Sequence, residues 1–177
     1  MGRVSVAPED IETLRAQLGR VPRGVVAVAA RCACGNPTVV KTAPRLPDGT
    51  PFPTLYYLTH PGAVAATSTL EATGAMRPMQ ERLGEDERLA AAYKAAHERY
   101  LEERYEIEDV EQIHGISAGG MPDRVKCLHV LVGHALGAGP GVNPLGDEAL
   151  ALMADRWRPD RCACDQPRSR SVDVERG

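Results

Sequence analysis

The hydrophobic period of the chain changes once, near residue 60, and this change most constrains its fold. Before residue 60, three short runs rich in β-branched residues, 24–31, 37–43 and 54–59, are separated by loops that carry turn residues. After it, apolar residues recur every three or four positions, which is typical of amphipathic helices. The pattern therefore predicts an α+β domain with a small, mainly antiparallel sheet of about three strands.

We expect four or five helices to cover this sheet. The segments with helical period and recognisable ends are 8–19, 61–74, 86–105, 123–137 and 144–157. Pro122 marks the start of the fourth, because proline is tolerated in a first helical turn. Residues 1–157 are expected to form a single domain, and the polar residues 158–177 a C-terminal tail that is partly disordered.

The composition excludes several classes of protein. Of the 177 residues, 43% are hydrophobic and 25% are charged, and 21 basic against 24 acidic side chains give a formal net charge of -3. Such a chain is neither disordered nor polybasic, so we expect no duplex nucleic acid as a partner. It contains no run of 18 apolar residues and no apolar signal segment at its start, so we expect no membrane span and a cytoplasmic location.

Four of the five cysteines form two C-x-C pairs. The tetrapeptide RCAC occurs twice and supplies Cys32 with Cys34, and Cys162 with Cys164. A disulfide framework is not expected in a reducing compartment, so the cysteines are candidate ligands, nucleophiles or core residues. Two such pairs brought together would offer the four thiolates that a tetrahedral zinc ion needs.

Sheet topology adds His60 to this candidate zinc site. In an antiparallel meander, the first strand and the third end at the same edge, which brings Cys32, Cys34 and His60 together. The positive end of the helix that begins at Pro61 disfavours protonated His60, and neutral imidazole is a metal ligand. Alternatively, the two cysteines are small turn residues and His60 is a surface histidine.

The helix expected over 123–137 carries further candidates. His129 and His134 are possible metal ligands, and Cys127 is a possible nucleophile aided by Lys126 and His129. On an ideal helix, however, Cys127 and His129 point in nearly opposite directions, and Cys127 and His134 are separated by about 10 Å of axial rise. Cys127 is alternatively a small buried apolar residue.

A glycine-rich stretch before this helix is a candidate site for a small anionic ligand. Free backbone N–H groups, a helix start and two cations would suit such a ligand; the residues are Ser117, Gly119, Gly120, Arg124 and Lys126. The stretch lacks the ending of a Walker loop and follows no strand, so it matches neither nucleotide-binding fingerprint. A flexible connector explains the glycines equally well.

Three strings resemble a known family. RCACGNP at 31–37, DGTPFPTLYYLT at 48–59 and the long string at 115–150 are similar to the bacterial family catalogued as domain of unknown function 501. The resemblance spans about 18–150 and implies a cytoplasmic bacterial protein with no established activity. It also implies that the gene lies near genes for enolase, a septum-formation initiator and an exopolyphosphatase. In the family pattern, a cysteine occupies the position of Cys32, and a cysteine often occupies the position of His60.

No stretch matches a catalytic signature specific enough to name a reaction. The leading hypothesis is a metal-binding protein, with zinc as the metal. The first alternative is a non-enzymatic interaction module linked to cell division or envelope genes. The second is a small hydrolase that acts on phosphorylated ligands.

Overall fold

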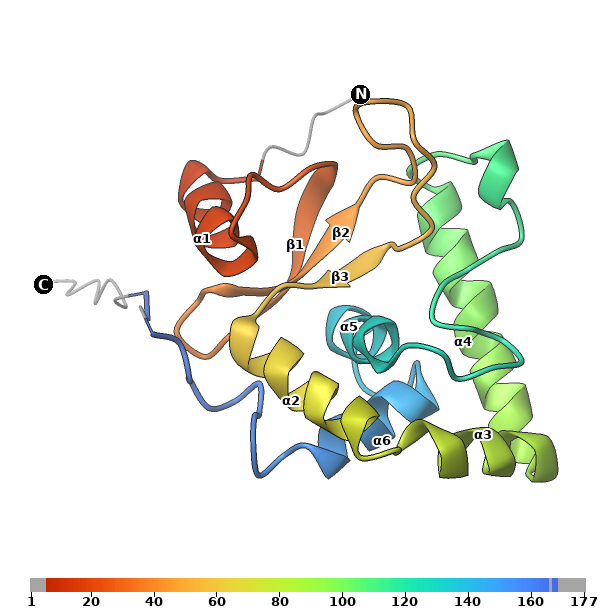
Figure 1. Ribbon diagram of the computed structural model, residues 1–177. Helices are drawn as coiled ribbons and strands as arrows, with labels where there is room; N and C mark the ends of the chain where they lie inside the picture. Colours follow the sequence, from red (N-terminus) through yellow and green to blue (C-terminus); the bar gives the residue numbers. More distant parts are fainter. Residues whose placement is uncertain (1–5, 166, 169–177) are drawn as a thin grey trace, which may run out of the picture.

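The computed structural model describes residues 6–165, 167 and 168. Strands β1 (Val25–Arg31), β2 (Pro37–Thr42) and β3 (Tyr56–Leu58) form an antiparallel sheet in the order β1-β2-β3 (Figure 1). Within the described residues the helices are α1 (Pro8–Leu18), α2 (Pro61–Ala72), α3 (Met76–Glu85), α4 (Glu87–Tyr105), α5 (Leu128–Ala138) and α6 (Pro144–Leu152), with a short 3-10 turn at Glu111–Ile113. The predicted α+β class is confirmed, with six α-helices where four or five were expected.

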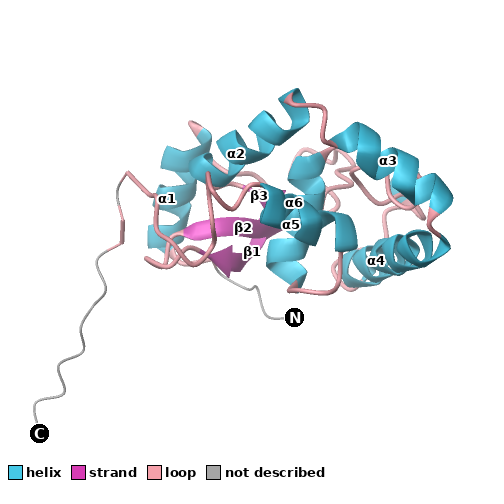
Figure 2. Cartoon of the chain, turned by 90° about the horizontal axis from the view of Figure 1, so that it is seen from below, coloured by secondary structure: helices cyan, strands magenta, loops and turns pink. Residues whose placement is uncertain are grey.

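Helix α5 packs against one face of the sheet (Figure 2). Val39, Tyr56 and Leu58 are buried in the same cluster as the apolar side of α5, as the alternation of a strand requires. Gly133 permits the close contact, because a Cβ there would lie 2.9 Å from the carbonyl oxygen of Tyr56. The core therefore begins between the sheet and α5, and the same cluster continues to buried residues of α2, α3, α4 and α6.

The opposite face of the sheet carries the alternate strand residues. Val40 and Tyr57 are paired across β2 and β3, and they line a small pocket together with Leu18 and Phe52. Leu18 is the last residue of α1, so this helix and the loop before β3 flank this face of the sheet.

Helix α3 was not predicted, because Gly74 was interpreted as the end of all helical structure before residue 86. In the structure α3 follows α2 after a short turn and buries Met79 and Leu83. Helix α4 has the predicted amphipathic stripe, and its buried side includes Tyr93 and Tyr100.

Helix α5 begins at Leu128, so the prediction of a helix start at Pro122 is wrong. Gly119 and Gly120 have φ angles of 69° and 94°, a conformation that favours glycine. Their carbonyl oxygens accept hydrogen bonds from the N–H groups of Lys126 and Arg124, respectively, each at 2.8 Å. The chain therefore forms a tight loop here, and its backbone groups are not available for a helix.

Candidate metal centre

The first C-x-C pair lies in a rigid turn between β1 and β2. The N–H of Cys32 donates to the carbonyl of Asn36, and the N–H of Gly35 donates to the carbonyl of Cys32, both at 2.8 Å. Gly35 has a φ of 95°, which an L side chain rarely adopts. The Arg31 guanidinium donates to the Gly35 carbonyl at 2.9 Å and to both carboxylate oxygens of buried Asp10 at 2.8 Å. These contacts fix the turn against α1.

The second C-x-C pair comes from the segment that follows α6. After α6 the chain passes the start of α2 and reaches the turn between β1 and β2 (Figure 1). The Sγ of Cys164 lies 3.6 Å from that of Cys34 and 3.7 Å from that of Cys32. The ligand atoms of all four cysteines, including Cys162, lie within 4.8 Å of one another.

This spacing of the sulfurs is compatible with a metal site. A disulfide would place two sulfurs about 2.05 Å apart, so the closest pairs are not covalently joined. Four sulfurs at about 2.3 Å around one tetrahedral zinc lie about 3.8 Å from each other, close to the two observed distances. The four thiols could therefore hold one metal ion.

His60 is at the same sheet edge, as the meander predicted, but its position differs from that of a ligand. Its Nδ1 accepts the N–H groups of Gly62 and Ala63 at 3.0 and 3.4 Å, so His60 caps α2. Burial lowers the pKa of His60 and keeps the imidazole neutral, so its single proton is on Nε2. Nε2 lies 3.2 Å from the Sγ of Cys164, so it donates a hydrogen bond to a candidate ligand.

The pKa values of Cys32, Cys34 and Cys164 differ. Burial raises the pKa of Cys32, and burial also raises that of Cys164. Burial opposes ionisation of Cys34 too, but hydrogen bonds from Asn36 and Arg168 outweigh it and lower the pKa of Cys34 to about 6. A bound cation would favour the thiolate form of all four, because it removes the repulsion between like charges.

A second group of potential ligands lies near the C-terminal end of α2. The ligand atoms of Glu71, Cys127 and His129 lie within 4.8 Å of one another. His129 Nδ1 is 3.2 Å from Glu71 Oε1, and its Nε2 is 3.1 Å from Ser68 Oγ. Glu71 Oε1 also accepts the N–H of Leu128 at 2.8 Å.

The late start of α5 explains why Cys127 and His129 meet. Cys127 precedes the helix in an extended conformation, with φ −149° and ψ 107°. The divergence of the two side chains expected on an ideal helix therefore does not apply, because Cys127 is not helical. Hydrogen bonding to His129 lowers the pKa of Cys127 despite its burial, and the same contact raises the pKa of His129. Ser68 and Glu71 were not predicted as site residues, because α2 carries no motif that marks them.

His134 is remote from both groups, which corrects its assignment as a ligand. It is fully buried against the rings of Tyr56 and Tyr100, with centroid distances of 5.5 and 4.9 Å. Its Nδ1 is 3.2 Å from Asn143 Nδ2, and burial lowers its pKa to about 4. His134 is therefore a neutral core residue.

The candidate anion-binding stretch forms the loop before α5. Ser117 is buried, and its Oγ lies 2.8 Å from His97 Nδ1. The N–H groups of Arg124 and Lys126 are bonded within the loop, as described above, and α5 begins only at Leu128, two residues after Lys126. The two cations therefore do not lie in the first turns of a helix, and anion binding by their side chains stays a prediction.

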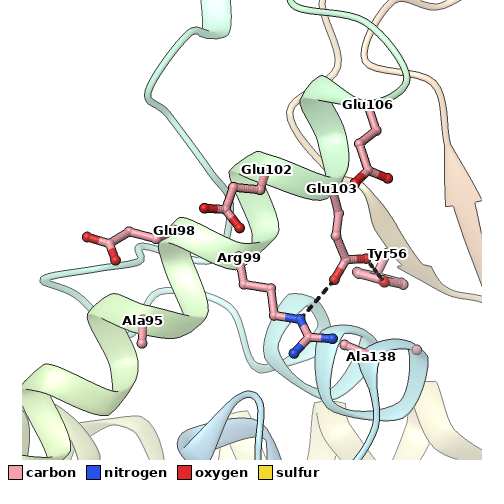
Figure 3. Close-up of a pocket in the computed structure, with 9 residues that line it drawn as sticks. Tyr56, Ala95, Glu98, Arg99, Glu102, Glu103, Glu106 and Ala138 are labelled. Atoms are coloured by element: carbon pink, nitrogen blue, oxygen red, sulfur yellow. Dashed lines mark hydrogen bonds and ion pairs between the residues drawn. The ribbon is translucent and has the colours of Figure 1, made fainter.

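An acidic hollow of about 620 Å³ lies along α4 (Figure 3). Glu98, Glu102 and Glu106 extend from the helix, while Glu103 contacts both Arg99 and the hydroxyl of Tyr56. Glu103, one of the four carboxylates that line the hollow, is therefore already paired, and we assign no chemistry to this surface.

The fold and the site define an α+β protein in which four cysteines converge at one sheet edge. The chain belongs to the family described as "Protein of unknown function (DUF501)", whose model matches residues 28–151. This range contains Cys32 and Cys34 and ends before Cys162 and Cys164. Searches of the curated proteins and of the solved structures found no match. Among the described residues, no helix is long and apolar enough to cross a membrane.

Proposed function

We propose that the protein binds zinc through Cys32, Cys34, Cys162 and Cys164. The observation that carries this proposal is the convergence of four sulfurs from segments about 130 residues apart, with closest distances of 3.6 and 3.7 Å. A set of four thiolates selects a soft or borderline metal and excludes magnesium and calcium, which prefer oxygen ligands.

The role of this zinc is structural. Four protein thiolates fill the tetrahedral coordination sphere, so no position is left for water or substrate. The ion would join the turn between β1 and β2 to the segment after α6, which Arg168 also ties to α1 through Asp10 at 2.8 Å. All five cysteines are free thiols, which suits a reducing compartment such as the bacterial cytoplasm.

Elemental analysis of the untagged protein, purified without chelator, tests the proposal. Cys34→Ser and Cys164→Ser should each lose about one equivalent of zinc per chain, because three thiolates no longer close the site. Ala33→Ser changes an exposed residue of the same turn and should keep the wild-type zinc content. Equal zinc content in all four proteins, after reloading with excess zinc, would show that the cluster is not a metal site.

A further inference from the structure

The group near the C-terminal end of α2 lies at a cavity. Cys127 and His129 line a hollow of about 590 Å³ between α2, α5 and the sheet. Its other walls are largely apolar and include Leu18, Leu58 and Val64. Cys127 and His129 are half-buried, so their polar atoms are shielded without being cut off from this space.

We propose that Glu71, Cys127 and His129 form a second metal site, with zinc as the ion and an open coordination position at the cavity. The three residues provide one carboxylate oxygen, one sulfur and one imidazole nitrogen, all of which are zinc ligands. Glu71 Oε1 and His129 Nδ1 are 3.2 Å apart, and two ligands bound to one tetrahedral zinc at about 2.1 Å would lie about 3.4 Å apart.

The surroundings orient these ligands. Without a metal, Nδ1 of His129 donates its proton to the Glu71 carboxylate, and a metal would replace that proton. Ser68 Oγ at 3.1 Å would then accept the Nε2 proton. The N–H of Leu128 orients Glu71 from the start of α5. Glu71 and Cys127 offer a divalent cation two ligands that are anionic when bound to it.

The number of protein ligands sets the chemistry of this site. Three protein ligands leave a fourth position for water or a bound ligand, which is the arrangement of catalytic zinc sites, whereas the four-cysteine site is closed. The apolar walls suit a ligand with an apolar body and one metal-binding oxygen or sulfur. The two sites share no residue.

Cobalt loading of the full chain separates the two sites. Reduced protein is stripped with chelator, loaded with Co²⁺ and freed of excess, and bound cobalt and its visible absorption are measured. Wild type should hold about two equivalents, and Cys127→Ser and His129→Gln about one, with the tetrathiolate absorption retained. Glu98→Gln, an exposed carboxylate on α4, should still hold two.

The outcomes distinguish this inference from the proposed function. If wild type holds one cobalt that Cys34→Ser loses and His129→Gln retains, the second site is refuted and the four-cysteine site stands. If the single cobalt is lost in His129→Gln and retained in Cys34→Ser, the four-cysteine site is refuted and the second site stands.

Alkylation provides a readout on the unmodified chain. Zinc should slow the reaction of Cys127 with iodoacetamide, followed by mass spectrometry of its peptide, and a chelator should restore the rate. Ser68→Ala should raise the zinc concentration needed for this protection by about 10- to 100-fold, because it removes the hydrogen-bond acceptor for Nε2 of His129. An alkylation rate of Cys127 that is independent of zinc would overturn the inference.

Discussion

Nε2 of His60 lies 3.2 Å from the Sγ of Cys164, although 104 residues separate them in the chain. The same imidazole caps α2 through Nδ1. One side chain thus connects the start of a helix to a sulfur of the candidate zinc site. Hydrogen bonds of this kind orient metal ligands and reduce the charge on a bound thiolate.

His60→Asn separates these two functions. Asparagine is a good N-cap, so α2 should persist, but its shorter side chain does not reach the sulfur. We expect zinc affinity, measured by competition with a chromophoric chelator, to fall about 10- to 100-fold. Helix content by circular dichroism should stay near that of wild type, and an unchanged zinc affinity would show that the contact with Cys164 does not support the site.

Removal of zinc should loosen the segment that carries Cys162 and Cys164. Trypsin should cleave after Arg161 faster in the presence of chelator, because the segment loses its attachment to the β1–β2 turn. At free zinc of 1,000 times Kd, binding contributes about 4 kcal/mol, so the Tm should fall by roughly 8–16 °C after chelation. Identical cleavage rates with and without chelator would contradict this expectation.

Acidification should destabilise the fold through His134. Its folded pKa of about 4 is lower than the usual 6.5, so the unfolded chain binds more protons between these values. The free energy of unfolding is therefore highest above pH 6.5 and falls as pH drops towards 4, by at most about 3 kcal/mol. His134→Gln does not titrate, so its urea-unfolding free energy should decline less than that of wild type between pH 7 and 5. Parallel declines would refute this assignment.

Two glycines in helices should respond oppositely to alanine. In α6, a Cβ on Gly146 would collide with the carbonyl oxygen of Leu131 in α5, so Gly146→Ala should cost about 1–3 kcal/mol. In α3, a Cβ on Gly84 meets no atom within 4 Å, so Gly84→Ala should stabilise by up to about 1 kcal/mol. Urea unfolding measures both, and a Gly146→Ala variant as stable as wild type would show that the α5–α6 contact is not as close as described.

Local sequence patterns determined the strands, most helices and the edge at which Cys32, Cys34 and His60 meet. The three β-branched runs became a meander because short connections make sequential antiparallel strands neighbours. The start of α5 escaped this reasoning, because Pro122 is compatible with a helix start as well as with a turn. The carbonyl oxygens of the two loop glycines accept hydrogen bonds from the N–H groups of Arg124 and Lys126, and these bonds stabilise the turn instead of a helix.

The sequence by itself thus determined the candidate metal ligands, which are two C-x-C pairs and several histidines. It also determined the sheet edge at which some of these ligands lie. Only the tertiary structure decided which donors meet. It brought Cys164 to Cys34, turned His60 into a hydrogen-bond donor and buried His134 in the core. It also placed Glu71 of α2 beside His129 of α5. The physical reason is that these contacts follow from how helices pack on the sheet, which no local period encodes.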